Sequence, residues 1–286
     1  MLYIVVPTYN RTEIFYKFVK QMEKQKYQEY VLIVVDHGKY KTNYSADNAY
    51  VIDCDVNGWS YAINVGIRFV MNELNASMED YILVINDDVL MDEDYLDCVH
   101  NAIMQRPNSL IGSACYEWNT GKVLHLNMKL NRKKATLIYR YKNSLRNKIN
   151  NEFYDSDVLK GRGTVLPVRV LNEIGLYNEK KLPHYRADHE LAWRAKKRGY
   201  DVCVSGNMWL GAILDSPHRM DLHRTFFENY RRIFKDMISV QNTRDLWNYS
   251  FCCYELLYGC YFFMINSVRD HLKFVLDYWK GEKNNG

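Results

Sequence analysis

Several features that mark specialised classes of protein are missing from this 286-residue chain. Its seven cysteines form no C-x-x-C pair, and an odd number of scattered cysteines favours reduced thiols in the cytoplasm over a disulfide framework. No run of about 18 uncharged apolar residues occurs, because Glu255 interrupts the nearest candidate at 249–265, so no transmembrane helix is predicted. The first strand-like run also lacks a following G-x-G-x-x-G, which argues against a dinucleotide-dependent oxidoreductase.

A strong charge of either sign is absent too. The net charge of +4 is too small to indicate nucleic-acid binding, although it suits anionic ligands or an acidic membrane surface. Residues 1–7 have neither a basic segment nor an apolar stretch long enough for a secretory signal, and they are typical of a first strand. The 24 tyrosines would suit sugar stacking or a bilayer interface, but tyrosine is also common in ordinary cores.

Apolar runs and helical periodicity alternate through the first half of the chain. Short β-branched runs predict strands, and apolar positions spaced three and four apart predict helices. The strands are expected at 3–6, 31–35, 50–52, 81–86 and 110–114, and the helices at 12–25, 59–74 and 92–104. This alternation predicts an α/β fold with a mostly parallel, doubly wound sheet flanked by helices.

The middle of the chain departs from this pattern. Residues 123–130 and 135–141 predict an antiparallel excursion, and the stretch 129–148 carries eight lysines and arginines but no acid. This basic stretch is either a solvated loop, or an active-site lid or contact for an anionic acceptor or lipid.

A helix at 188–198 and strands at 201–204 and 209–214 are expected next, followed by a helical, aromatic segment. We therefore expect a catalytic domain over 1–218 and a helical C-terminal extension over 219–286. The aromatic residues of the extension predict packing on the catalytic domain or on a second subunit, or else an interfacial platform at a membrane.

The strongest local signal is the apolar run at 81–85, which ends in Asn86, Asp87 and Asp88. A core strand gains nothing from two carboxylates, but the carboxyl ends of parallel strands are where α/β proteins bind ligands. Hard oxygen ligands there can hold a divalent cation, which in turn suits an anionic group such as a diphosphate. The alternative is a polar loop before the next helix.

Three other segments follow predicted strands or open predicted helices. Asp36 ends a strand and could accept a hydrogen bond from a base such as uracil, or be an ordinary loop aspartate. Gly58 lets a backbone approach a ligand closely at a helix start, with Asn57 and Asn64 near the same edge. The first strand leads into a turn that offers donors to a nucleotide or simply precedes a helix; its residues are Pro7, Thr8, Tyr9, Asn10 and Arg11.

These motifs, in this order, resemble the inverting GT-A glycosyltransferases of family 2, of the type that assembles bacterial polysaccharides. The resemblance covers roughly 3–218 and extends beyond the N-terminal motifs. Its later landmarks are Gly161-Arg162-Gly163-Thr164-Val165-Leu166-Pro167, Ile174-Gly175-Leu176-Tyr177-Asn178-Glu179, His184-Tyr185-Arg186-Ala187-Asp188-His189-Glu190-Leu191-Ala192-Trp193-Arg194 and Arg198-Gly199-Tyr200.

The resemblance implies a role for each matching position. Asp188 would be the catalytic base, and Asp88, the last residue of the D-x-D-type motif, would bind Mg²⁺ or Mn²⁺ together with His218. Asn86 stands where that motif often has a first carboxylate, which puts the affinity of the metal in doubt. The nucleotide-sugar contacts would come from Pro7, Thr8, Tyr9, Asn10, Arg11, Asp36, Asn57, Gly58, Asn64 and Asp87, and the acceptor and donor-sugar pocket from Gly161, Arg162, Gly163, Thr164 and His189.

The resemblance implies transfer of a sugar, with inversion, from a UDP- or dTDP-sugar to a hydroxyl of a glycan or lipid-linked acceptor. Contact with the inner face of the cell membrane and a homodimer through the C-terminal helices are further expectations. Two alternatives stay open: a non-catalytic carbohydrate-binding or scaffold protein with a decayed site, and a nucleotidyltransferase. The pair Asp88 and Asp188 argues against the first, and the lack of a glycine-rich loop after the first strand argues against the second.

Overall fold

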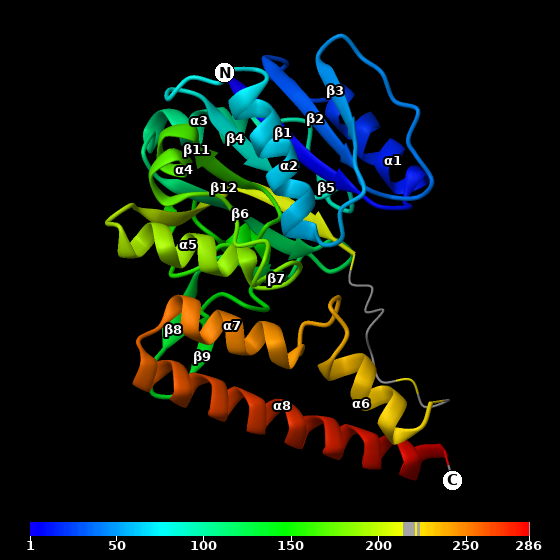
Figure 1. Ribbon diagram of the computed structural model, residues 1–286. Coiled ribbons are helices and arrows are strands. Elements are labelled where there is room, and N and C mark those ends of the chain that lie inside the picture. Colours follow the sequence, from blue (N-terminus) through cyan, green and yellow to red (C-terminus); the bar gives the residue numbers. More distant parts are fainter. Residues whose placement is uncertain (214–220, 222–223, 286) are drawn as a thin grey trace.

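The computed structural model describes residues 1–213, 221 and 224–285. A mixed sheet with helices on both faces forms the centre of this part of the chain (Figure 1). Its strands are β1 (Leu2–Thr8), β2 (Tyr30–Asp36), β3 (Ala49–Asp53), β4 (Tyr81–Val84), β5 (Leu90–Met91), β6 (Leu110–Glu117), β7 (Val123–His125), β10 (Phe153–Asp155), β11 (Thr164–Pro167) and β12 (Val202–Ala212). The spatial order is β10-β12-β6-β11-β4-β1-β2-β3, with β5 paired to β12 and β7 paired to β6.

The α/β prediction is confirmed. Strands β3, β2, β1 and β4 are parallel neighbours, and β6 is parallel to β12, whereas β11 enters antiparallel between β4 and β6. The helices of this region are α1 (Thr12–Glu23), α2 (Trp59–Asn72), α3 (Tyr95–Gln105), α4 (Val168–Ile174) and α5 (Ala187–Lys197).

Side-chain alternation along the strands builds a core on each face of the sheet. In β1, Ile4 and Val6 pack with α1 and α3, while Tyr3 and Val5 pack with α2, α4 and α5. All seven residues of β1 are buried, as expected for a central strand covered on both faces.

One strand prediction is wrong. The two strands expected at 201–204 and 209–214 are a single strand, β12, whose pairing with β6 shifts between Ser205 and Trp209. Gly206 and Asn207 have the composition of a turn, but here they are absorbed in a β-bulge without ending the strand.

The antiparallel excursion is confirmed, and its tip does not hang free. Strands β8 (Met128–Asn131) and β9 (Thr136–Tyr139) form a hairpin. Its tip lies against α8 (Leu256–Asn285), where Tyr261 Oη donates to the Lys133 carbonyl at 2.5 Å and Asn266 Nδ2 donates to the Ala135 carbonyl at 2.9 Å. The basic residues near the tip are therefore held by the C-terminal helix and are not part of an open lid.

The C-terminal extension is helical, as expected. Helices α6 (Phe226–Phe234) and α7 (Thr243–Cys253) precede α8, which runs along the lower edge of the molecule in Figure 1. Helix α7 packs between α5 and α8, and Trp193 Nε1 of α5 donates to the Cys253 carbonyl at 2.7 Å. The expected domain boundary at 218 lies outside the described residues. Among the helices that are described, none has the length and apolar character needed to cross a membrane.

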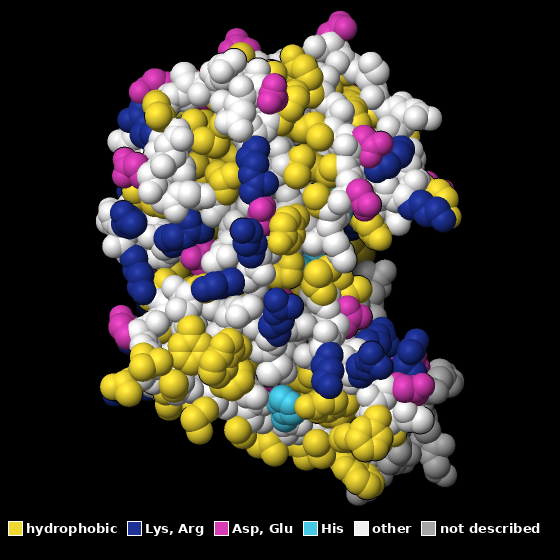
Figure 2. All heavy atoms as spheres, viewed as in Figure 1, with side chains coloured by type: hydrophobic (Ala, Val, Ile, Leu, Met, Phe, Trp, Pro, Cys, Tyr) yellow, Lys and Arg dark blue, Asp and Glu magenta, His cyan; other side chains and the backbone are white. Residues whose placement is uncertain are grey.

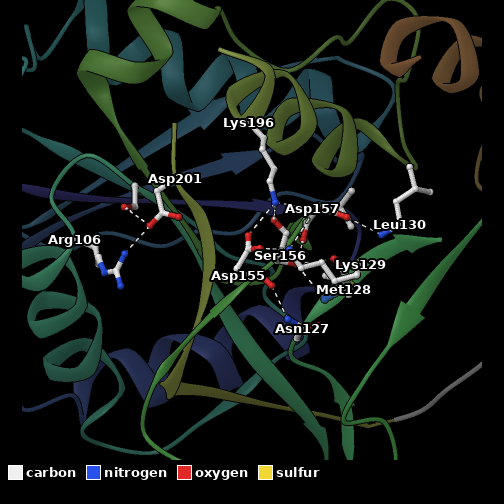
Figure 3. Close-up of polar contacts among 12 residues, drawn as sticks. Arg106, Asn127, Met128, Lys129, Leu130, Asp155, Ser156, Asp157, Lys196 and Asp201 are labelled. Atoms are coloured by element: carbon white, nitrogen blue, oxygen red, sulfur yellow. Dashed lines mark hydrogen bonds and ion pairs between the residues drawn. The ribbon is translucent and has the colours of Figure 1, made fainter. Parts of the chain in front are cut away.

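An ionic cluster ties α5 to the strands beside it (Figure 3). Lys196 Nζ lies 2.9 Å from Asp155 Oδ1 and 2.7 Å from Asp157 Oδ1, and Lys129 pairs with the same two aspartates. Asp157 Oδ2 also accepts from the Leu130 N–H at 2.7 Å. The cluster thus fixes the helix that carries Asp188 against β10 and the β8–β9 hairpin.

Candidate functional site

The predicted nucleotide-binding residues gather where β1, β2 and β4 end. The register pairs Thr8 with Asp36, and the chain after β4 continues beside β1 through the Ile85 N–H, which donates to the Val5 carbonyl at 3.1 Å. Parallel strands bring their carboxyl ends to one edge, so the turns that follow them share one surface.

Arg11 joins the first of these turns to the carboxylates after β4. Its Nη2 lies 2.5 Å from Asp87 Oδ1, and its Nη1 lies 3.4 Å from Asp88 Oδ2. The side chain of Asp87 has no solvent exposure, and its Oδ2 has no hydrogen-bond partner among the described residues. Burial raises the pKa of Asp87 to about 6, against the opposing effect of Arg11.

Asp88 is the accessible carboxylate of the pair. One third of its side chain is exposed, and Oδ2 lies 3.4 Å from Arg11 and 3.9 Å from Arg162. Asn86 points elsewhere, since its Oδ1 accepts from Trp59 Nε1 at 2.9 Å. Asp88 is therefore the strand-tip group that can reach a ligand from solvent.

The metal expected here would have few protein ligands. Among the described residues, no group of three histidines, cysteines, aspartates or glutamates could hold an ion, and His218 lies outside them. Asp88 nevertheless fits one mode of binding, because Mg²⁺ commonly uses one or two carboxylates together with substrate phosphates. The donor set suits a bridging ion and not a closed protein cage.

Asp36 orders the turn that follows β2. Its carboxylate is buried and accepts from the Gly38 N–H at 3.2 Å and the Thr42 N–H at 2.6 Å. Asn10, with a φ of 52°, accepts from the Tyr40 N–H at 3.0 Å, so the turns after β1 and β2 support each other. The base contact expected of Asp36 stays a prediction. Pro7 and Thr8 are buried at the end of β1, whereas Tyr9 is exposed.

The start of α2 contributes in two different ways. Gly58 has a φ of 117°, and an added Cβ would lie 2.5 Å from the Pro183 carbonyl oxygen, so this position requires glycine. Asn57 is exposed beside it. Asn64 is buried, and its amide bonds to the Tyr177 backbone and to Glu179 at 2.6–3.1 Å. Asn64 thus positions the loop after α4, and its predicted nucleotide contact is untested.

Asp188 lies at the N-terminus of α5, after Arg186, which has a left-handed φ of 67°. Its Oδ2 accepts from the Gly161 N–H at 2.9 Å and its Oδ1 from its neighbour's N–H, that of His189, at 2.8 Å. Burial opposes ionisation, but His189, Lys160 and these two N–H donors outweigh it, so the pKa of Asp188 lies below its ordinary value. The side chain is therefore ionised at neutral pH.

The segment before β11 brings the two halves of the site together. Gly161 binds Asp188 through its N–H, and the next residue, Arg162, reaches Asp88. An added Cβ on Gly161 would lie 2.5 Å from the Trp59 ring, so the backbone rests directly on that ring. Gly163 has a φ of 72°, and Thr164 is buried, where its hydroxyl donates to the Lys160 carbonyl at 2.6 Å.

His189 is brought to the site but is enclosed. Its ring faces Tyr249 of α7, with ring centres 6.2 Å apart, and its Nε2 is buried without a hydrogen bond in the described structure. Burial, with the nearby Lys160 charge, lowers the pKa of His189 to about 3, so the ring is neutral at physiological pH. Its expected contact with sugar is untested.

Sequence reasoning missed several members of the site. Trp59 supports Gly161 and Asn86, and Tyr185 lies close enough to Asp88, Arg162 and Asp188 for their charges to act on its hydroxyl, while burial raises its pKa. The position of Trp59 directly after Gly58 was a usable signal. Nothing in the spacing could have placed Tyr185, because its position depends on how the loop before α5 folds.

Comparison with known proteins adds two findings. The family model described as glycosyl transferase family 2 matches residues 3–164, more than half of the chain. A search of curated proteins found no match.

Solved structures share the fold. GalNAc-T7, solved with UDP, GalNAc and Mn²⁺, superposes with a TM-score of 0.58 at 11% identity, over 97% of this chain and 54% of that chain. TarS of S. aureus superposes with a TM-score of 0.53 at 16% identity, over 93% and 54%. The chain spans about half the length of these two proteins. The family match over residues 3–164 and the shared fold lead to one conclusion: the chain belongs to glycosyl transferase family 2 and has the GT-A fold.

Proposed function

We propose that the protein transfers a sugar, with inversion, from a UDP- or dTDP-sugar to a hydroxyl of a glycan or lipid-linked acceptor. The observation that carries this proposal is the bridge formed by two consecutive residues. Gly161 binds Asp188, and Arg162 reaches Asp88, so an ionised carboxylate and a solvent-accessible one face the same segment.

The residues divide the chemistry between them. Asp188, kept ionised by two N–H donors, accepts the proton of the acceptor hydroxyl as its oxygen attacks the anomeric carbon. A positioned base of this kind contributes roughly 10²–10⁴-fold in rate. Attack from the side opposite the leaving nucleoside diphosphate gives inversion. Arg11 and Arg162 flank Asp88 and supply positive charge where the diphosphate would lie.

Asp88 would hold Mg²⁺ or Mn²⁺ on the diphosphate, with His218 as the second predicted ligand. Such an ion offsets the charge that develops on the leaving group. GalNAc-T7 was solved with Mn²⁺ and UDP, and TarS residues 1–349 with UDP, which supports a uridine diphosphate donor and a divalent ion in this chain as well.

We also propose contact with the inner face of the membrane. Exposed apolar side chains follow one face of α8 at helical spacing, and they lie along the lower edge of the molecule in Figure 2. They are Leu257, Tyr261, Met264, Val268, Leu272, Leu276 and Trp279. Arg269, Lys273 and Lys280 adjoin this face, and a cationic flank beside apolar and aromatic residues suits an anionic bilayer surface. Sedimentation with anionic vesicles tests this contact; if Leu272→Glu instead abolished a homodimer, the face would be a subunit interface.

A panel of nucleotide sugars with Mg²⁺ or Mn²⁺ tests the main proposal. Slow hydrolysis of one UDP- or dTDP-sugar is expected, because water can replace the acceptor hydroxyl. If no nucleotide sugar bound or turned over with either metal, a non-catalytic carbohydrate-binding protein would be the better reading.

A further inference from the structure

A cavity of about 940 Å³ lies where the chain leaves β5, and Asp92, the residue directly after that strand, lines it. Its walls come from the start of α3, the β6–β7 turn, the segment 145–151 and the bulge of β12. This volume is at the upper end of the range of roughly 300–1,000 Å³ usual for small-molecule sites. None of the residues assigned above to the donor, the base or the metal lines it.

Arg146, one of the lining residues, is held in place by contacts on two sides. Arg146 lies over the Tyr116 ring at 4.8 Å and the Trp209 ring at 5.5 Å, and its Nη2 contacts Asp92 Oδ2 at 2.8 Å. Trp209 is buried, and its Nε1 donates to the Gly206 carbonyl. These contacts hold the Arg146 side chain in one position, so it would move little when a ligand binds.

Solvent-exposed polar side chains also line the cavity. They are the amides of Asn147, Asn151 and Asn207 and the carboxylate of Asp94, and none of these side chains makes a hydrogen bond within the described residues. Each amide offers both a donor and an acceptor, which is what a ring of hydroxyl groups requires.

The charge of the lining excludes a phosphate ligand. Its charged side chains are Asp92 and Asp94 against Arg146, whose guanidinium is already paired with Asp92. An anion would therefore meet a net negative wall. A neutral saccharide fits better, because its hydroxyls can bond to the amides while its C–H face packs on the aliphatic side chains of Leu145 and Ile149.

The cavity lies within reach of the catalytic edge. Only three residues of chain separate Asp88 from Asp92, so the Cα atoms of these two residues are at most about 14 Å apart. Strand β5 runs between them and pairs Met91 with Leu210, which brings Asp92 to the bulge that carries Trp209. We propose that this cavity binds neutral sugar units of the acceptor glycan, behind the unit whose hydroxyl is glycosylated; the acceptor role rests on the proposed function.

Saturation-transfer NMR and titration with neutral oligosaccharides of two to four units, without donor, test the site directly. The wild type is compared with the triple variant Asn147→Ala, Asn151→Ala, Asn207→Ala and with Asn72→Ala, an exposed asparagine at the end of α2. At least one oligosaccharide should bind the wild type and Asn72→Ala, and the triple variant should bind it at least about tenfold more weakly. With that oligosaccharide as acceptor, KM should rise similarly, while donor hydrolysis without acceptor stays unchanged.

The outcomes separate this proposal from the previous one. Binding that survives in the triple variant, or no binding of any neutral oligosaccharide, would overturn the assignment of the cavity. If no nucleotide sugar is hydrolysed, the proposed function fails, and the donor-free binding comparison still decides whether the cavity is a saccharide site.

Discussion

Two carboxylates of the same site, Asp87 at the strand tip and Asp188 at the helix start, have opposite electrostatic behaviour. Asp87 has one ion pair, with Arg11, and an oxygen without a hydrogen bond, and its pKa is raised to about 6. Asp188 accepts an N–H on each oxygen, and its pKa is lowered despite burial. The difference shows that depth alone does not decide which carboxylate remains charged: His189, Lys160 and the two N–H donors outweigh burial at Asp188, whereas Arg11 does not outweigh it at Asp87.

The largest expected effect comes from removing the charge at the helix start. Asp188→Asn should lower the transfer rate by about 10²–10⁴-fold, because the acceptor hydroxyl loses its base. Single-turnover rates at saturating donor and acceptor measure this effect. Thermal unfolding serves as the control, and a variant that folded normally with an undiminished rate would exclude Asp188 as the base.

A smaller loss of transfer rate is expected when the segment Gly161-Arg162, which contacts both Asp188 and Asp88, is displaced. Gly161→Ala places a Cβ 2.5 Å from the Trp59 ring, so the N–H that binds Asp188 must move. Displacements of this size cost up to about 100-fold in rate, with about 1–3 kcal/mol of stability. Rate and denaturation midpoint should be measured together, so that a loss of rate is distinguished from a loss of stability, and an unchanged rate in a stably folded variant would contradict this role of Gly161.

A pH series tests the strand-tip carboxylate. Since the folded-state pKa of Asp87 lies above the ordinary value of 3.8, its contribution favours folding below about pH 4 and is lost as pH rises through about 6. Asp87→Asn should therefore remove part of the fall in unfolding free energy between pH 4 and 7.

Urea denaturation at several pH values measures that fall. Asp245, whose pKa burial also raises to about 6, offers a matched comparison through Asp245→Asn. An unchanged pH dependence in Asp87→Asn would show that this carboxyl titrates normally in the folded protein.

The smallest effect on the transfer rate is expected from breaking the ionic cluster of Lys196, Asp155 and Asp157 shown in Figure 3. Lys196→Met leaves Asp157 without its cation at 2.7 Å and should destabilise the protein by about 1–3 kcal/mol. Lys17→Met, at an exposed lysine of α1, should have little effect on stability. Chemical denaturation checks both, and a rate loss larger than the fraction unfolded would indicate that the cluster also orients Asp188.

The sequence was enough to predict the strand-tip half of the site. Asp36 and Asp88 follow apolar runs directly, and a parallel sheet must bring such residues to one edge. The helix of Asp188 was also predicted within one residue at each end. These features depend on the local pattern of apolar residues and on the rule that neighbouring parallel strands bring their carboxyl ends to one edge of the sheet.

The rest depended on packing between distant segments. Asn64 could not be assigned to the loop at 177–179 from its spacing, because α2 and that loop are over 100 residues apart. The continuity of β12 was hidden by a bulge that has the composition of a turn. Gly161 contacts both Trp59 and Asp188 because β11 enters the sheet antiparallel. No local sequence pattern predicts that strand direction.

The central claim is that Asp88 serves the donor and Asp188 serves the acceptor within one site. Calorimetric titration of UDP with Mn²⁺ into wild type, Asp88→Asn and Asp188→Asn tests it directly. Asp88→Asn should weaken UDP binding at least about tenfold, as expected for a lost metal ligand, whereas Asp188→Asn should bind UDP as the wild type does. Equal affinities in all three proteins, or a loss confined to Asp188→Asn, would contradict this division of roles.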